Sequence, residues 1–387
     1  MTFETVKFSE ITVNHDKKRI PLSTMERSKR QGSYRYYGAQ GVIDYIDDYI
    51  FDGKYLLIAE DGENLKAKKQ NIAQLAEGRF WVNNHAHIVQ CNERCRLEYL
   101  CFMLNSMDLS GYITGSAQPK LSQANMNNIS FEIPSVEMQD LILSVILPIE
   151  KRIATNTAIN ENLEQQIQTI LLNLIKSDSQ KDSIENVKLG DYLYIKGRIG
   201  WKGLKKDEYL ESSDYRIING ESLTKDGIDW RKAGYISAER YDESPEIMLQ
   251  TGDILLSKDG TIGKIGYVDR LDSPSTVASG IFVIRNIKPD IISTPFIYYL
   301  LKSKLFTAFI ASRTEGSVIP HLYQKDFMEF MIPLPNAQEM NQFDSLTSPL
   351  FATIVKNLRE NELLAATRDA LLPKLMNGEI DVSAVQI

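Results

Sequence analysis

The chain repeats itself once, at a distance of about 200 residues, and this repeat limits the fold more than any other feature of the sequence. The repeat is clearest in one long segment of each half, where the offset is 201 residues without a gap. Identical residues at that offset are Pro148 and Pro349, Asn156 and Asn357, Asn160 and Asn361, Glu161 and Glu362, Leu163 and Leu364, Leu171 and Leu372, and Leu174 and Leu375. The repeat predicts two related modules, each followed by one copy of this segment.

Shorter matches run in the same order through the rest of the two halves. Leu56–Gly62 aligns with Leu255–Gly260, Gly115-Ser116 with Gly316-Ser317, and Phe131–Pro134 with Phe330–Pro333. The offset slips slightly between these matches, which is expected where loops differ in length.

Each copy of the long segment predicts a helix with an apolar seam, because its apolar and asparagine residues alternate by four and three. The first seam comprises Ile149, Ile153, Asn156, Asn160, Leu163 and Ile167, and the second comprises Leu350, Ile354, Asn357, Asn361, Leu364 and Leu371. We expect Pro148 and Pro349 to open the helices and Asn377-Gly378 to end the second one.

The two seams are expected to pack on each other as an antiparallel coiled coil. A single amphipathic helix of roughly 40 Å is marginally stable in water, and pairing through the seams is the simplest way to bury them. The asparagines in both seams are residues that specify register in coiled coils at some cost in stability. The alternative is that the helices are ordinary core elements of two separate domains.

The rest of the chain predicts strand-rich modules, because short alternating runs are punctuated by glycines and turn pairs. We therefore expect an α+β fold with two pseudo-symmetric strand-rich domains, at residues 1–135 and 181–335. Two helical spacers, at residues 136–180 and 336–387, would join them. The loops between matching strands differ most, which indicates two different targets for one kind of module.

Charge is segregated along the chain. The 44 basic and 51 acidic residues give a net charge of −7, which argues against non-specific coating of nucleic acid. Residues 1–40 and 188–206 are nevertheless basic, whereas residues 135–185 are acidic. Sequence signals for export or membrane insertion are missing and the three cysteines are crowded together, so we expect a cytoplasmic protein with reduced thiols.

Motifs for catalysis or cofactor binding are missing from the sequence. The stretch Gly260–Lys264 is too short for a phosphate-binding loop and predicts a strand turn instead. His85, His87, Cys91 and Cys95 have a spacing that fits none of the usual closed zinc sites. We expect no catalytic residue, no metal and no cofactor.

Basic and amide side chains interleaved with aromatics are the residue types that contact DNA. The predicted DNA-binding residues of the first half are Tyr34, Arg35, Tyr36, Tyr37, Lys54, Asn83, Asn84, Gln118 and Lys120. Those of the second half are Arg198, Trp201, Lys202, Lys258, Lys264, Arg313 and His321. The alternative for each position is an ordinary solvated surface residue.

Over its whole length the chain resembles the specificity (S) subunit of Type I restriction-modification enzymes. The resemblance rests on Gly252–Gly266 (GDILLSKDGTIGKIG), Gly316–Leu322 (GSVIPHL), Ile332-Pro-Leu-Pro with Gln338, and Arg368–Ile380 (RDALLPKLMNGEI). The first half departs from this pattern, since Leu56–Gly62 lacks the second glycine turn and Ile133–Val136 keeps only one proline.

The resemblance implies a non-catalytic subunit with two target recognition domains, each reading one half of a split site in double-stranded DNA. It also implies that the helices act as a ruler and dock two methyltransferase (M) subunits, and through them the restriction (R) subunits. Helices of roughly 40 Å suit half-sites about 34–36 Å apart.

Two other functions are alternatives to this one. A self-sufficient DNA-modifying enzyme needs a methyl-donor loop and a base pocket of the N-P-P-[YF] type, and the sequence has no Pro-Pro pair. A tandem protein-interaction module without a DNA role would show no salt-dependent DNA binding.

Overall fold

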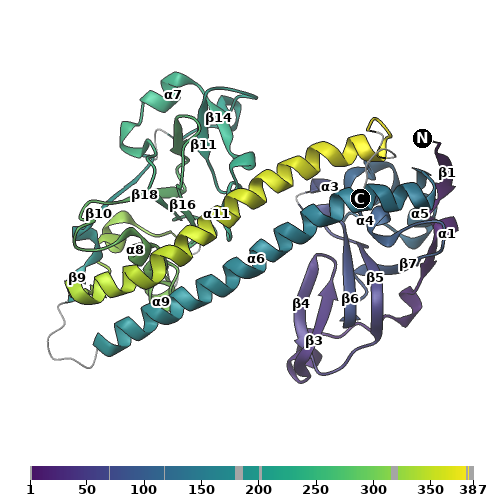
Figure 1. The fold of residues 1–387 in the computed structure, drawn as a ribbon, viewed down its shortest axis with the longest axis horizontal. Helices are drawn as coiled ribbons and strands as arrows, with labels where there is room; N and C mark the ends of the chain where they lie inside the picture. Colours follow the sequence, from purple (N-terminus) through teal and green to yellow (C-terminus); the bar gives the residue numbers. More distant parts are fainter. Residues whose placement is uncertain are drawn as a thin grey trace. The chain divides into compact units, whose positions relative to one another are not determined.

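The computed structural model describes residues 2–68, 70–116, 118–178, 186–199, 203–314, 321–380 and 382 (Figure 1). It divides into two compact units. Unit 1 is Met1–Ala154 with Asn361–Ile387, and unit 2 is Thr155–Glu360. The fold is mixed α+β, as the sequence predicts, with a strand-rich module in each unit and two long helices that run through both. No helix of the described residues is long and apolar enough to cross a membrane.

The module of unit 1 is built on a six-stranded sheet in the order β2-β7-β5-β6-β3-β4. These strands are β2 (Thr12–Asn14), β3 (Gln31–Gly38), β4 (Gly41–Ile46), β5 (Phe51–Ala59), β6 (Ala73–Val82) and β7 (Ala86–Cys91). A separate pair joins β1 (Glu4–Lys7) to β8 (Ser130–Ile133). Helical segments are α1 (Phe8–Ile11), η1 (Asp16–Lys18), α2 (Thr24–Ser28), α3 (Asn64–Ala67), α4 (Leu97–Ser106), η2 (Ser110–Tyr112) and α5 (Gln123–Asn127).

Alternate residues of β5 face two different cores, as the two-residue period of a strand requires. Leu56 and Ile58 pack with α4, whereas Leu57 packs with Phe80 and Ile88. The core around α4 also takes in Leu375 and Val382 from the end of the chain. Unit 1 is therefore completed by residues more than 200 positions away from its sheet.

The module of unit 2 is built on a four-stranded sheet in the order β10-β18-β15-β16. These strands are β10 (Leu193–Gly197), β15 (Ile254–Ser257), β16 (Ile265–Tyr267) and β18 (Ile281–Asn286). Three smaller sheets pair β9 (Asn186–Lys188) with β19 (Met331–Pro333), β12 (Leu223–Thr224) with β13 (Gly227–Ile228), and β11 (Tyr215–Ile218) with both β14 (Gly234–Ile236) and β17 (Ser275–Val277). Helical segments are η3 (Leu189–Asp191), η5 (Lys206–Glu208), η6 (Trp230–Lys232), α7 (Ala238–Asp242), η7 (Pro245–Ile247), α8 (Thr294–Leu301), α9 (Lys304–Thr314) and α10 (Gln324–Met328).

The two modules share one frame. The strands β2-β7-β5 correspond to β10-β18-β15, and β1 paired with β8 corresponds to β9 paired with β19. A helix follows each central strand set, α4 in unit 1 and α8 in unit 2. β6 and β16 also correspond, since each pairs antiparallel with the preceding central strand. The modules differ in what is added to this frame: β3 and β4 extend the sheet of unit 1, whereas unit 2 adds the small sheets that contain β11–β14 and β17. The glycine-rich stretch Gly260–Lys264 is a turn between β15 and β16, as predicted.

The long helices α6 (Val136–Asp178) and α11 (Ala337–Met376) are longer than predicted at their N-terminal ends. The expectation that Pro148 and Pro349 open them is wrong, because both prolines lie inside the helices. A proline inside a helix removes one backbone hydrogen bond, but packing of the preceding turns compensates. Ile142 and Ile146 are buried in the unit 1 core. The predicted end of the second helix is confirmed, since α11 stops at Met376 and Gly378 has a φ of +78°.

The two helices pack antiparallel to each other. In unit 2, Asn156 Nδ2 donates to Glu360 Oε2 over 3.1 Å, and Asn357 Nδ2 donates to Asn160 Oδ1 over 2.8 Å. Asn160 also donates to the carbonyl oxygen of Ile354, so residue numbers fall along α11 as they rise along α6. In unit 1, Arg368 Nη1 donates to Glu150 Oε1 over 2.8 Å. Each residue of the two predicted seams is buried or half-buried.

Replacing Asn156 and Asn357 together by Leu should keep or raise the stability of the protein while loosening the register of the two helices. Replacing a buried polar contact by apolar residues of similar volume often stabilises a protein, but apolar residues specify the alignment of two helices less strictly. Urea unfolding should show an unchanged or higher midpoint, and hydrogen exchange of amides along both helices should accelerate. The control is Asn162→Leu, at an exposed position of α6. A lower midpoint together with unchanged exchange would contradict the role given to these asparagines.

Candidate nucleic-acid interface

Three segments of unit 1 meet at the end of β5 and bring several predicted DNA-binding residues together. The backbones of Asp61 and Lys120 form an isolated bridge, and Leu121 N donates to the carbonyl oxygen of Glu60 over 2.8 Å. Glu60 N donates in turn to the carbonyl oxygen of His85, in the connection between β6 and β7. The exposed Asn84, Gln118 and Lys120 thus lie on two loops that are tied to the same strand end.

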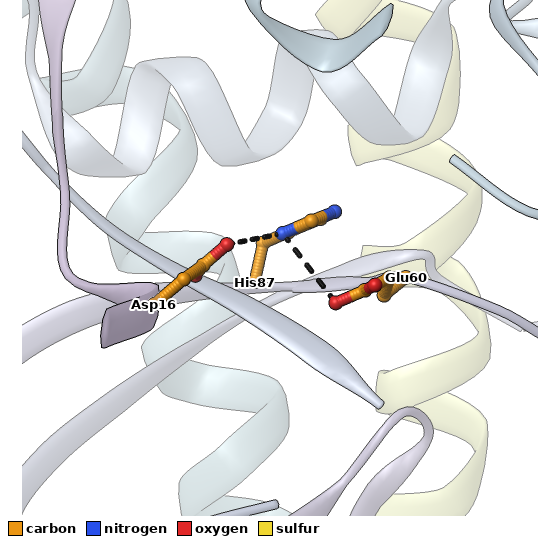
Figure 2. A group of neighbouring side chains, drawn as sticks. All are labelled: Asp16, Glu60 and His87. Carbon is orange, nitrogen blue, oxygen red and sulfur yellow. Dashed lines mark hydrogen bonds and ion pairs between the residues drawn. The ribbon is translucent and has the colours of Figure 1, made fainter. Parts of the chain in front are cut away.

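A buried network of charged side chains lies beneath these loops (Figure 2). His87 Nδ1 lies 2.6 Å from Asp16 Oδ2 and 3.7 Å from Glu60 Oε2. His87 Nε2 lies 2.8 Å from the carbonyl oxygen of Leu121, an acceptor. Both ring nitrogens therefore face hydrogen-bond acceptors. Two cations complete the network. Arg19 Nη1 lies 2.7 Å from Glu60 Oε2, and Lys120 Nζ lies 3.1 Å from Glu60 Oε1.

The hydrogen-bonding capacity of this network is used within the protein. Burial would raise the pKa of Asp16, but the hydrogen bond and charge of His87, together with the N–H of Ile88, outweigh it and leave the pKa below its ordinary value. Burial would also raise the pKa of Glu60, but hydrogen bonds from Arg19 and Lys120 outweigh it and leave that pKa below its ordinary value. Asp16, Glu60 and His87 have the residue types and spacing of a metal site, yet their ligand atoms already hold these partners. We assign the network a structural role: it clamps the Lys120 loop to the sheet.

The corresponding place in unit 2 carries different side chains on the same backbone. Asp259 and His321 form an isolated bridge equivalent to that of Asp61 and Lys120, and Leu322 N donates to the carbonyl oxygen of Lys258. The ammonium group of Lys258 lies over the ring of Phe282, and its Nζ is 3.4 Å from Asp259 Oδ2. Two other predicted residues of this half are at the surface: Lys264 Nζ donates to the carbonyl oxygen of Gly220 over 2.9 Å, and Arg313 is exposed beside Phe309.

The aromatic cluster predicted on β3 divides between surface and core. Tyr36 is 0% exposed and Tyr37 is 4% exposed, and Leu22 N donates to the hydroxyl oxygen of Tyr36. Tyr34 and Arg35 are half-buried, with the ring of Tyr34 5.1 Å from that of Tyr49. Lys54 forms an ion pair with Glu98 of α4. Tyr36 and Tyr37 stabilise the sheet and have no surface for a DNA contact.

Two more predicted residues are buried. Asn83 is 7% exposed, and its Oδ1 accepts the N–H of His85 within the β6–β7 connection. Arg198 is 3% exposed, with Nε donating to the carbonyl oxygen of Val277 over 3.1 Å. Burial lowers the pKa of Arg198, as does the charge of Arg240. Alternation of basic and aromatic residues could not distinguish these side chains from exposed ones. The predicted residues Trp201 and Lys202 lie outside the residues that the structure describes.

Residues that sequence reasoning missed lie at the same strand end. The sequence indicates no contact between His85 and Asp61, but His85 Nδ1 lies 2.8 Å from Asp61 Oδ2. Asp16, Arg19 and Glu60 were also missed. The one available signal was the alignment of Asp61-Gly62 with Asp259-Gly260, which marked an aspartate common to both halves.

Asp16→Asn should lower the free energy of unfolding by about 1.5–3 kcal/mol at pH 7, because a hydrogen bond to a charged partner is weakened. The folded pKa of Asp16 is lowered, so its contribution is present above the ordinary pKa near 4 and is lost as the pH falls through the folded value. The difference in urea stability between wild type and Asp16→Asn should therefore shrink at low pH. Asp272→Asn is the control, at an exposed carboxylate beside Arg270. A difference that stays constant with pH would contradict this assignment.

Comparison with known proteins gives a consistent result. The family model described as "Type I restriction modification DNA specificity domain" matches residues 1–165 and 181–363. The HindI specificity subunit of a Type I restriction enzyme from Haemophilus influenzae is 24% identical over 415 residues, covering 88% of this chain and 87% of the relative. The MjaIX specificity subunit from Methanocaldococcus jannaschii is 25% identical over 307 residues, covering 74% of this chain and 69% of the relative.

A solved structure shares the fold. The S subunit of a Type I restriction-modification system from M. genitalium superposes with a TM-score of 0.60 at 15% identity, over 97% of this chain and 96% of that one. S subunits are the non-catalytic specificity subunits of their complexes, in agreement with the lack of catalytic motifs in this sequence. The family prediction is confirmed: this chain belongs to the Type I restriction modification DNA specificity family.

Proposed function

We propose that this chain reads a bipartite target in double-stranded DNA, with one half-site for each module, and scaffolds two methyltransferase subunits and, through them, restriction subunits. The observation that carries the proposal is the pair of modules with one shared frame and different additions, joined to one antiparallel helix pair. A shared frame places the two modules on DNA in the same way, whereas different additions read different bases. In this proposal residues 1–135 and 181–335 are the target recognition domains, and residues 136–180 and 336–387 are the spacers.

The predicted DNA-binding residues that remain at the surface support DNA as the ligand of both modules. The predicted residues that retain exposed surface are Tyr34, Arg35, Lys54, Asn84, Gln118, Lys120, Lys258, Lys264, Arg313 and His321. Lysine and arginine at such positions supply the salt-dependent part of DNA affinity. The acidic stretch 135–185, which contains all of α6, suits a protein partner better than phosphates. We propose this stretch as part of the face that binds the methyltransferase subunits.

The helices would set the distance between half-sites. Since α6 and α11 are each held in one register by the Asn156, Asn160 and Asn357 contacts, the pair has the properties of a spacer of defined length. The alternative function, a tandem protein-interaction module, accounts for the repeat but gives no reason for the cationic and amide side chains at both strand ends. That alternative predicts no salt-dependent binding of DNA by the assembled complex.

Mapping of N6-methyladenine across the host genome, with this gene intact and deleted, tests the proposal most directly. We expect a two-part motif with a fixed gap that disappears on deletion and returns on complementation. If no motif depends on the gene, DNA binding by the purified complex decides between a silent methyltransferase and the protein-interaction alternative.

Inserting or deleting four residues within 160–170 should change the gap between the half-sites and leave both half-sites intact. The expected change follows from the rise of about 1.5 Å per helical residue. Methylation mapping of the variant gives the gap directly, and a substitution at the exposed Asn162 serves as a control for disturbance of α6. An unchanged gap would refute the ruler.

A further inference from the structure

Unit 1 presents an exposed histidine that is held by an aspartate. His85 Nδ1 lies 3.0 and 2.8 Å from the two carboxylate oxygens of Asp61. The His85 side chain is 49% exposed, whereas Asp61 is 20% exposed. The carboxylate therefore fixes the ring from the protein side.

Unit 2 presents the same pair in a different way. His321 Nδ1 pairs with the carboxylate of Asp259, and the His321 side chain is 32% exposed. Asp259 is equivalent to Asp61 in the repeat. The backbone of Asp259 bridges to His321, and the backbone of Asp61 bridges to Lys120 at the equivalent place. The two histidines, however, come from different places in the chain: His85 precedes β7, whereas His321 precedes α10. The pair is thus common to both modules although its histidine is not.

An imidazole held through Nδ1 offers Nε2 to a ligand. Within the described residues, the recorded polar contacts of both rings are made by Nδ1 alone. A carboxylate on Nδ1 orients the ring and favours the form that carries a proton on that nitrogen. In the neutral ring Nε2 is then an acceptor, and in the doubly protonated ring it is a donor that can bind a phosphate oxygen. Lys120 and Lys258 add positive charge beside the two pairs.

We propose that His85 and His321 contact the sugar-phosphate backbone of DNA, one in each half-site. This inference rests on the proposed function. The two modules differ in the parts that would read bases, so a feature that both keep should bind what both half-sites share, which is phosphate. The pairs therefore position each module on the duplex and do not select its sequence.

The test uses the full chain assembled with its methyltransferase subunits. His85→Ala, His321→Ala and the double variant are compared with wild type on two duplexes, one with the methylated motif and one with both half-sites scrambled. Each single substitution should weaken binding by about tenfold, the effect of one charge-assisted hydrogen bond, and by the same factor on both duplexes. The methylation motif in cells should stay unchanged.

Two further variants separate a DNA contact from a structural effect. His85→Gln and His321→Gln keep a donor and should recover most of the lost affinity. Lys225→Ala removes an exposed cation beside Asp226, in the β12–β13 turn, and should change affinity less than twofold if the effect belongs to the histidine pairs. Thermal melting of each variant shows whether it is folded.

The outcomes are distinguishable. Unchanged affinity in folded alanine variants overturns the inference, and so does an altered methylation motif or a loss confined to the motif duplex, since either one indicates a base contact. Failure of the wild-type complex to bind any duplex would instead refute the proposed function itself.

Discussion

Both units of this protein are built around the antiparallel contact between α6 and α11. Each unit takes a segment of both helices, and unit 1 is discontinuous in sequence because it combines Met1–Ala154 with Asn361–Ile387. In unit 1, Leu375 of α11 shares a core with Ile142 and Ile146 of α6 and with the central strand β5. In unit 2, Ile167 of α6 shares a core with Ile354 of α11. Each module therefore folds against a helix that belongs to the other repeat.

Polar groups make this contact specific. Apolar side chains along the seams supply most of the burial, but apolar contacts alone tolerate shifts along the helix axis. Asn156, Asn160 and Asn357 satisfy their amides only in one alignment, with Glu360, Ile354 and each other. A fixed alignment is what a spacer between two DNA half-sites would need.

The modules show how one frame can carry two specificities. Central strands, the following helix and the bridge at the strand end recur in both units, while the added strands differ. Side chains at the recurring bridge nevertheless differ, since Lys120 of unit 1 is replaced by His321 in unit 2, and Glu60, which precedes the bridging aspartate, is replaced by Lys258. Backbone geometry is kept while side-chain chemistry changes, as expected of repeats that serve different targets.

The repeat, the two helices with their seams, the strand-rich modules and the family can all be predicted from the sequence, because periodicity and repeated motifs are visible in the order of residues alone. Tertiary structure alone decided which polar residues reach the surface. Tyr36, Tyr37 and Arg198 have residue types that contact DNA, but packing places them in the interior: both faces of β3 are covered at the two tyrosines, and Arg198 is buried just after β10. His85 and Asp61 form a pair across 24 residues, and His321 and Asp259 across 62. Such contacts depend on how the loops fold back onto the strand ends, and no local pattern records that.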